Sequence, residues 1–215
     1  MDNTKIIEEI KKLTEAEKRN LPYEKLKNII NGLNTEEIKK LSNVIGYPVF
    51  IRMCMGELRH KIPILQDGSA AIIENLQGEI LLQRRKDNDR WGLPGGCQEL
   101  GERFQEVIIR EIKEETNLEV KEEDLELLDI ISGLSRKKEY PNGDVVINNT
   151  ALYLVKKYSG ELIWDDESKD MKFFSLDSLP KNQHDPDLIK VYITYDPQKL
   201  VEEVNYSKVV LDRKG

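Results

Sequence analysis

The sequence predicts an α/β fold, with a mixed sheet covered by a helix on each face and preceded by a small helical extension. Three observations support this. Apolar residues recur at helical spacing over residues 1–46, short apolar runs separated by turn residues begin at about residue 47, and an acidic amphipathic helix follows a glycine-rich segment at 93–96. We therefore divide the chain into a helical N-terminal extension, residues 1–46, and a main domain with a C-terminal helix, residues 47–215.

The N-terminal extension carries helix start signals and apolar stripes. Thr14 with Glu17 and Asn34 with Glu37 each form a capping-box pattern. The apolar stripe at i, i+3, i+4 and i+7 is formed by Leu26, Ile29, Ile30 and Leu33, and it continues in Ile38, Leu41 and Ile45. Helices this short cannot bury such stripes alone. We expect them to pack on the main domain or on a second copy of the chain, as a homodimer.

The sequence of the main domain predicts strands, one loop, two turns and two helices. Expected strands are Tyr47–Ile51, Ile62–Leu65, Leu125–Ile131, Val145–Asn149, Thr150–Lys157 and Met171–Ser175. A hairpin is expected from Ala70–Ile73 and Glu79–Gln83 around a turn at Asn75–Gly78, with a loop at Leu93–Gly96 and a turn at Tyr140–Asp144. The two helices are expected at about residues 101–116 and at 187–205, the second interrupted by Pro197.

The composition restricts the function classes. Of 215 residues, 34% are charged and the net charge is −7, which argues against nonspecific binding to a nucleic acid backbone. No apolar run is long enough for a membrane span, and the N-terminus lacks the pattern of a signal peptide. Cys54 and Cys97 form no disulfide framework. These features predict a soluble cytoplasmic protein with a small-molecule partner.

Residues 96–118 contain a cluster of acids with helical spacing. Glu111, Glu114 and Glu115 fall on one face of a helix, and Glu102 lies nine residues before the first of them. Like charges at these spacings destabilise a helix, and Lys113 is the only cation inside the cluster. Clustered carboxylates are the oxygen ligands that suit Mg²⁺ or Mn²⁺. The cluster therefore predicts a divalent metal site.

The same run resembles the Nudix box, the signature of Nudix hydrolases. The matching positions are Gly96, Glu102, Arg110, Glu111, Ile112, Glu114, Glu115 and Leu118. Asn117 departs from the pattern, because the family has a glycine there. Helices often end with a residue in the left-handed conformation, where Gly is the most frequent residue and Asn is the next. The departure therefore does not affect the metal ligands. The resemblance implies a Nudix α/β/α sandwich across about residues 63–180.

The resemblance also implies roles for individual residues. Glu111, Glu114 and Glu115 would hold Mg²⁺ or Mn²⁺ and serve catalysis, and Glu102 would join the metal site or be held by Arg110 in a bidentate pair. Gly95 would bring its backbone carbonyl to the metal. The base that deprotonates the attacking water would be a box glutamate or an acid of a later loop, and that loop offers Asp165, Asp166 and Glu167.

Substrate residues are expected next to the box. Arg84, Arg85 and Arg90 precede it and are candidates for binding phosphate, with surface charge as the alternative for each. Trp91 and Tyr140 would stack on a base or pack in the core or a turn. His60 and His184 are the only histidines, and neither lies in a motif for a covalent intermediate. We therefore expect direct attack of water at phosphorus.

The substrate expected from the resemblance is a nucleoside diphosphate joined to a sugar or an alcohol, with a nucleoside triphosphate second. Residues 131–136, ISGLSR, lack the proline that accompanies ADP-ribose cleavage in the family and the tyrosine of dinucleoside polyphosphate enzymes. No NADH tag is present, and the helical extension resembles that of CDP-choline-type pyrophosphatases. The alternative function is a catalytically weak Nudix domain that senses a ligand.

Overall fold

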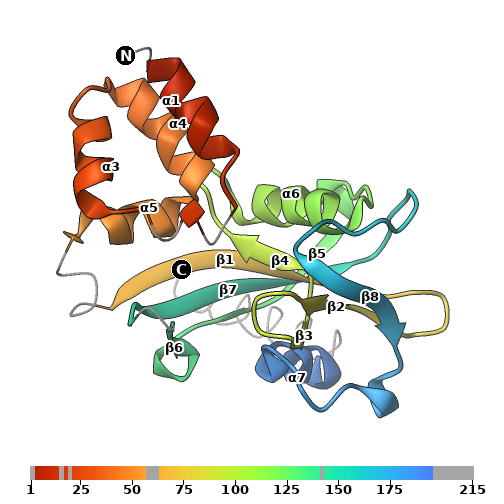
Figure 1. The fold of residues 1–215 in the computed structure, drawn as a ribbon. Helices are drawn as coiled ribbons and strands as arrows, with labels where there is room; N and C mark the ends of the chain where they lie inside the picture. Colours follow the sequence, from red (N-terminus) through yellow and green to blue (C-terminus); the bar gives the residue numbers. More distant parts are fainter. Residues whose placement is uncertain (1–2, 15–16, 19–20, 57–62, 141–142, 196–215) are drawn as a thin grey trace, which may run out of the picture.

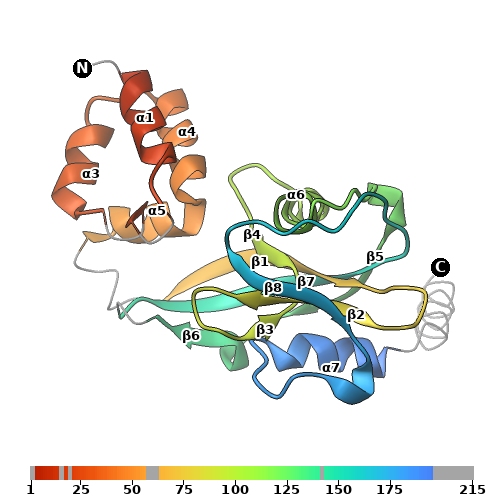
Figure 2. The same ribbon diagram turned by 45° about the vertical axis from the view of Figure 1, so that its right-hand side comes forward.

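The computed structural model describes residues 3–14, 17–18, 21–56, 63–140 and 143–195. It contains an N-terminal group of helices followed by a two-sheet domain with one helix on each face (Figures 1 and 2). The fold is therefore α/β with a helical N-terminal part, as predicted. Every helix in the described ranges is too short or too polar to cross a bilayer. His60 lies outside the described residues.

The N-terminal helices build a hydrophobic core of their own. They are α1 (Asn3–Lys11), α3 (Tyr23–Ile30), α4 (Thr35–Ile45) and α5 (Tyr47–Cys54). Their buried apolar residues form one cluster, which consists of Ile7, Ile10, Leu21, Leu26, Leu41, Ile45, Phe50 and Met53. The stripes thus pack mainly on one another, whereas we expected them to need the main domain or a second copy. Four short helices together enclose the apolar surface that none of them can bury alone.

Both predicted capping boxes are present. At the start of α4, the Asn34 side chain accepts a hydrogen bond from the Glu37 amide at 3.0 Å, and Glu37 accepts one from the Asn34 amide at 2.9 Å. The Thr14 amide donates to Glu17 at 2.8 Å in the same reciprocal arrangement. Side chains therefore satisfy backbone donors that a helix start leaves without partners.

The strand predicted at Tyr47–Ile51 is wrong, because these residues open helix α5. Pro48 lies in the first turn of α5, where its missing amide costs no hydrogen bond. Phe50 and Met53 are three residues apart, and both enter the helical cluster. A short apolar run fits a buried strand and a helix equally well, and here the tertiary packing selects the helix.

The larger sheet has the order β4-β1-β7-β5, and β6 also pairs with β7. Its strands are β1 (Ile64–Ile73), β4 (Gly95–Cys97), β5 (Leu125–Ile131), β6 (Lys137–Glu139) and β7 (Val145–Val155). β1 and β7 run parallel, and the other pairs are antiparallel. The sheet is mixed, as predicted, and β5 has the predicted bounds. The two strands expected within 145–157 form the single strand β7.

The smaller sheet has the order β3-β2-β8, formed by β3 (Trp91–Gly92), β2 (Ile80–Arg85) and β8 (Ser168–Phe174). The predicted turn before β2 is present, since the Asn75 amide donates to the Glu79 carbonyl at 3.0 Å. The predicted hairpin pairing is wrong beyond one bridge between Glu74 and Ile80. β1 and β2 separate into different sheets, which brings β2 against β8 instead.

Part of the predicted loop at 93–96 is strand β4, which pairs with β1. Glycines make this pairing possible, because a Cβ on Gly68 would lie 2.3 Å from the Gly96 carbonyl oxygen. Gly95 has a positive φ of 149°, and a Cβ there would lie 2.3 Å from the Ser69 carbonyl oxygen. The close approach holds the start of the acidic segment against the central sheet.

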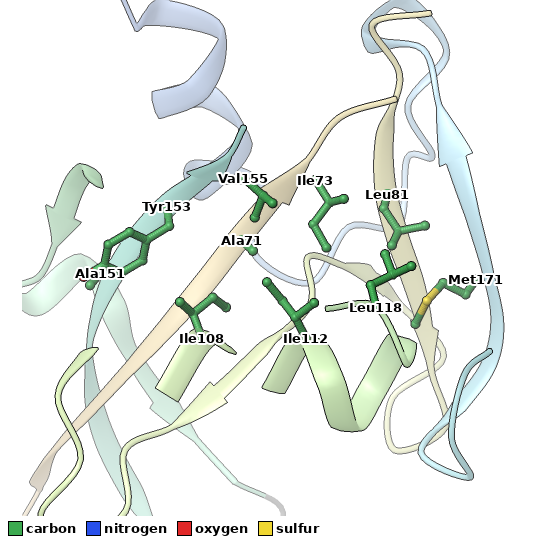
Figure 3. Close-up of a cluster of buried hydrophobic side chains, with 10 residues drawn as sticks. All are labelled: Ala71, Ile73, Leu81, Ile108, Ile112, Leu118, Ala151, Tyr153, Val155 and Met171. Atoms are coloured by element: carbon green, nitrogen blue, oxygen red, sulfur yellow. The ribbon is translucent and has the colours of Figure 1, made fainter. Parts of the chain in front are cut away.

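Two helices cover the domain, α6 (Phe104–Thr116) on one face and α7 (Pro186–Thr194) on the other (Figures 1 and 2). Alternate side chains of β1 point to opposite faces of the sheet and pack in different hydrophobic clusters. Ala71 and Ile73 pack with Ile108 and Ile112 of α6 (Figure 3), whereas Ala70 and Ile72 share a cluster with Leu188 and Ile189 of α7. α6 begins at Phe104, three residues after the predicted start. Beyond Tyr195, the predicted final helix lies outside the described residues.

Short 3-10 turns complete the chain, at Glu122–Asp124 (η2), Leu134–Arg136 (η3) and Leu176–Ser178 (η4). At the predicted turn before β7, the Tyr140 amide donates to the Asp144 carbonyl at 2.9 Å, while residues 141 and 142 lie outside the described ranges. This turn and η3 place β6 beside β7.

Candidate active site

Helix α6 separates its apolar and acidic residues onto different sides. Val107, Ile108 and Ile112 are fully buried in the domain core. Glu111, Glu114 and Glu115, at the predicted spacings of three and four, instead line a cavity of about 410 Å³. Since the apolar side of α6 is fixed by the sheet, the helical period places the three carboxylates toward this cavity.

The left-handed end of α6 is confirmed. Asn117 has φ 59° and ψ 4°, the conformation in which Gly and Asn are favoured. Its side-chain amide donates to the Glu161 carbonyl at 3.1 Å. The departure from the family glycine therefore keeps the geometry of the helix end.

Glu115 is the most deeply buried of the three acids, with 4% of its surface exposed. Its Oε1 accepts a hydrogen bond from Gln83 Nε2 at 2.7 Å, and its Oε2 accepts one from the Gly95 amide at 2.8 Å. Burial raises the pKa of Glu115 to about 8, and repulsion from Glu111 adds to the rise. Two directional hydrogen bonds thus fix the carboxylate in a position where its charge is poorly solvated.

Gln83 is itself held by a hydrogen bond from β8. Ser168 Oγ donates to Gln83 Oε1 at 2.8 Å, so the Gln83 amide group directs its nitrogen toward Glu115. Gln83 is 1% exposed and Ser168 is 4% exposed. This chain of contacts joins β8, β2 and α6 and orients Glu115. No local pattern predicts this chain of contacts, because Gln83 and Ser168 lie outside the box.

The predicted bidentate pair between Arg110 and Glu102 is confirmed. Arg110 Nε and Nη2 donate to the two Glu102 oxygens at 2.7 and 2.9 Å. Burial opposes ionisation of Glu102, yet the hydrogen bonds from Arg110 and the Glu99 amide hold its pKa below the usual value. Arg110 Nη1 also lies 2.7 Å from Glu111 and 3.2 Å from Glu114. One guanidinium therefore contacts three of the four box acids.

Glu111 lies against the glycine strand. A Cβ on Gly96 would approach Glu111 Oε1 to 2.1 Å, so only glycine leaves room for this carboxylate. Burial raises the pKa of Glu111 to about 7, although Arg110 acts in the opposite direction. Glu111 and Glu115 thus both carry a burial cost in their charged forms. A nearby cation would offset that cost.

The donor set fits a divalent metal by its chemistry. Glu111, Glu114 and Glu115 supply carboxylate oxygens to one cavity, and Gly95 and Gly96 keep side chains out of it. Within the described ranges, no three acid, histidine or cysteine side chains converge at metal-binding distance. Arg110 and Gln83 occupy hydrogen-bonding positions on these acids. Glu102 contacts Arg110 rather than the cavity lining, and Gly95 contributes its amide to Glu115.

The three arginines expected to bind phosphate lie in different places. Arg85 lines the cavity and pairs with Asp87 at 3.0 Å. Arg84 lies outside the lining and pairs with Asp89 at 2.9 Å. Arg90 is exposed and also lies outside the lining. The structure therefore brings one of the three to the box glutamates.

Among the acids of the later loop, Glu167 lines the cavity. Asp165 accepts a hydrogen bond from the Glu167 amide at 3.0 Å, which closes a local turn. Asp166 is fully exposed, 3.8 Å from Lys86. Only Glu167 of this group is thus placed with the box acids.

The two candidate stacking residues differ in environment. Trp91 packs in the core, where its ring meets Phe174 edge-on at 4.8 Å. Tyr140 lines the cavity, and the guanidinium of Arg52 lies 5.4 Å from its ring centroid. Cys97 also lines the cavity, and its carbonyl accepts a hydrogen bond from Arg110 at 3.1 Å, whereas Cys54 is exposed on α5.

The cavity extends well beyond the box. The junction of α4 and α5 contributes Val44, Gly46, Tyr47 and Arg52 to its lining. The turn η3, β6, β7 and the loop before α7 contribute Arg136, Lys138, Asn148, Thr150, His184 and Asp185. The sequence analysis missed these polar residues. They are scattered along the chain, and only the basic run Arg136–Lys138 could have drawn attention to them.

Comparison with known proteins agrees with this geometry. The family model described as NUDIX domain matches residues 65–195, more than half of the chain. The chain is 38% identical over 128 residues to a Methanocaldococcus jannaschii protein named ADP-ribose pyrophosphatase, which covers 58% of this chain and 70% of that protein. It is 47% identical over 49 residues to a Bacillus subtilis putative 8-oxo-dGTP diphosphatase, 23% of this chain and 33% of that protein.

A solved structure is also similar, that of a MutT NUDIX hydrolase from Burkholderia pseudomallei. It is 28% identical, covers 60% of this chain and 96% of its own, and has a TM-score of 0.49. The residues matched by the family model include the box helix, the cavity acids and nearly all of both sheets, and the Methanocaldococcus jannaschii relative is 38% identical over 70% of its own length. The chain therefore belongs to the Nudix family of hydrolases.

Proposed function

We propose that this protein is a divalent-metal-dependent pyrophosphohydrolase. Its substrate would be a nucleoside diphosphate joined to a sugar or an alcohol, with a nucleoside triphosphate second. The observation that carries the proposal is the placement of Glu111, Glu114 and Glu115 on one cavity lining beside Gly95 and Gly96. Hard carboxylate ligands beside open space suit Mg²⁺ or Mn²⁺ together with a diphosphate.

The relatives support the same order of substrates. ADP-ribose, in the name of the archaeal relative, is a nucleoside diphosphate joined to a sugar. The relative named for 8-oxo-dGTP, a triphosphate, matches over a much shorter stretch. The missing proline after the box leaves the identity of the sugar or alcohol open within this class.

Different residues of the cavity would bind the metal, bind phosphate and accept the proton of water. Glu111, Glu114 and Glu115 would hold Mg²⁺ or Mn²⁺, which when bound lowers the pKa of water and polarises the phosphoryl group. Arg85 would contact a phosphate oxygen, and Arg110 with Glu102 would keep the acid cluster in place. Glu167, the later-loop acid on the cavity lining, is our candidate for the group that accepts the water proton.

A substrate panel tests the activity directly. Nucleoside diphosphate sugars, nucleoside diphosphate alcohols and nucleoside triphosphates would be incubated with Mg²⁺ or Mn²⁺, and phosphate would be released from the products by a coupled phosphatase. We expect metal-dependent turnover of the sugar or alcohol derivatives, abolished by EDTA. Binding of these compounds without turnover under either metal would instead support the ligand-sensing alternative.

Isotope labelling tests the bond that breaks. Among the cavity residues, no side chain is expected to form a covalent intermediate, so water should attack phosphorus directly. Hydrolysis in ¹⁸O-water should place the label in a phosphate of one product. Label in the sugar or alcohol fragment, or a trapped phosphoenzyme, would contradict this mechanism.

Glu114→Gln tests the acid cluster with little structural disturbance. The Glu114 side chain is 57% exposed and contacts Arg110, so the change keeps its volume and removes only its charge. We expect turnover to fall at least about 100-fold, because even residues that contact metal ligands indirectly contribute about 10–100-fold. Thermal melting without metal should not fall. Near-normal turnover would remove Glu114 from the metal site.

A further inference from the structure

The part of the cavity formed by η3, β6 and the loop before α7 carries basic side chains that the hydrolytic step does not use. The elements β6 and α7 lie away from α6 (Figures 1 and 2). Arg136 Nη1 lies 3.2 Å from Asp185 Oδ1, and Lys138 Nζ lies 3.0 Å from the same oxygen. Arg136 Nη2 also reaches Thr150 Oγ1 at 3.5 Å. We call Arg136, Lys138, His184 and Asp185 the basic wall.

The charges of the basic wall do not balance. One carboxylate, Asp185, serves two cations. His184 does not change this balance, because burial and the nearby charge of Lys138 lower its pKa to about 4 and leave it neutral at pH 7. The other three arginines on the cavity lining each contact acids of their own: Arg52 contacts Asp144, Arg85 contacts Asp87, and Arg110 contacts the box glutamates. The wall therefore carries a net charge of about +1.

Burial makes this excess charge costly. Arg136 is 5% exposed, and its Nε has no hydrogen-bond partner. Buried ions are stable when they are paired and fully hydrogen-bonded, and here two cations share the carboxylate of Asp185. The Lys138 side chain, 27% exposed, keeps part of its surface open to the cavity. These features are typical of a site prepared for an anion.

We propose that Arg136 and Lys138 bind a second anionic group of the substrate, a carboxylate or a phosphate outside the diphosphate that is cleaved. This rests on the proposed function, because the diphosphate would occupy the glutamate side of the same cavity. The substrate class narrows accordingly to a nucleoside diphosphate whose sugar or alcohol carries acid, such as a sugar acid or a sugar phosphate. Neutral sugars would leave the excess positive charge of the basic wall without a counterion.

Matched substrates isolate the extra anion. Uridine diphosphate glucuronic acid carries a carboxylate where uridine diphosphate glucose carries a hydroxymethyl group. ADP-ribose 1″-phosphate differs from ADP-ribose by one phosphate on the distal ribose. We expect the acidic member of at least one pair to have a kcat/KM at least about tenfold higher, mainly through KM, as one charged hydrogen bond provides. The first pair reports on a carboxylate and the second on a phosphate.

The variants use two adjacent lysines of β6. Lys138→Met should bring the preference for the acidic member close to one, and Lys138→Arg should retain it. Lys137→Met is the matched control, because Lys137 is exposed on the same strand and does not line the cavity. It should leave the preference unchanged. Melting temperatures of all three variants would verify that they are folded.

The outcomes separate this inference from the proposed function. Equal kcat/KM within both pairs, or a preference that Lys138→Met and Lys137→Met affect equally, would overturn the basic wall as an anion site. Should the wild-type protein hydrolyse no nucleoside diphosphate derivative, the proposed function fails on its own. In that case, calorimetry would measure the affinities for both members of each pair. Tighter binding of the acidic member that is lost only in Lys138→Met would support the anion site, and equal affinities within both pairs would overturn it.

Discussion

At the scale of single residues, the acids that we propose as metal ligands depend on partners that lie outside the box. Gln83 and Ser168 form the hydrogen-bonded chain that orients Glu115. Residues that hold a metal ligand through a hydrogen bond commonly contribute about 10–100-fold to metal affinity or activity. The box motif in α6 identifies Glu115 in the sequence. Its side-chain position, however, also depends on Gln83 in β2 and Ser168 in β8.

Gln83→Met tests this dependence. The change keeps the approximate volume and removes the donor to Glu115 Oε1, so we expect the Mn²⁺ affinity, measured by electron paramagnetic resonance, to fall about 10–100-fold. Ser168→Ala should weaken affinity less, because Gln83 stays in place. Ser42→Ala is the control, since Ser42 is also buried and donates at 2.7 Å to a carbonyl, in α4. Equal effects of both serine changes would contradict a specific role for Ser168.

At the end of α6, Asn117 determines whether the helix stops correctly. Its φ of 59° is costly for a residue with an ordinary side chain. We expect Asn117→Ala to destabilise the protein by about 1 kcal/mol in urea unfolding, and Asn117→Gly to be tolerated because glycine adopts this conformation freely. A similar loss in both variants would show that the hydrogen bond to the Glu161 carbonyl, and not the backbone conformation, decides.

At the scale of elements, α6 concentrates carboxylates whose burial makes stability dependent on pH. The pKa values of Glu111 and Glu115 rise to about 7 and about 8 in the folded protein. Between their unfolded value of 4.5 and these values, the folded state binds more protons than the unfolded state. The free energy of unfolding therefore decreases as the pH rises through this window.

Thermal melting in EDTA would measure this effect. We expect a lower Tm at pH 8 than at pH 5.5, and a larger rise in Tm on adding Mg²⁺ at pH 8 than at pH 5.5, because only ionised carboxylates attract the cation. Glu115→Gln should make the Tm in EDTA less dependent on pH. An unchanged slope in this variant would mean that other groups cause the pH dependence.

At the scale of the whole molecule, a buried arginine joins the helical part to the sheet. Arg52 of α5 donates to Gln66 of β1 at 2.9 Å and lies 3.4 Å from Asp144, just before β7. Both members of the ion pair are almost completely buried. Since the cavity lining includes residues from both parts, this contact also holds the two sides of the cavity together.

Arg52→Met should destabilise the protein by about 3 kcal/mol, because it leaves the Asp144 carboxylate buried without its cation. The double variant Arg52→Met with Asp144→Asn should recover most of this loss. Urea unfolding of the two single variants and the double variant forms a double-mutant cycle that isolates the pair. Additive losses would show that the two side chains are not coupled.

Local sequence patterns determined the helix starts and the arrangement of residues within the box helix. Both capping boxes could be predicted because each satisfies backbone donors only three residues away, as the contacts of Thr14 and Asn34 show. The helical period places Glu111, Glu114 and Glu115 on the cavity side of α6, because the apolar side of this helix is buried against the sheet. The bidentate pair of Arg110 with Glu102 and the left-handed Asn117 were also predictable, since each needs only the box and its helix.

Tertiary structure decided what depends on distant segments. The apolar run at Tyr47–Ile51 became helical because Phe50 and Met53 complete the N-terminal core, and β1 and β2 separated because β7 and β8 offer them better partners. Arg85 and Glu167 reach the cavity, whereas Arg84, Arg90 and Asp166, which carry the same charges and lie nearby in the sequence, do not line it. The basic wall joins residues 136–138 to 184–185. Sequence spacing fixes which residues share a face of one element, but packing between elements decides which faces meet.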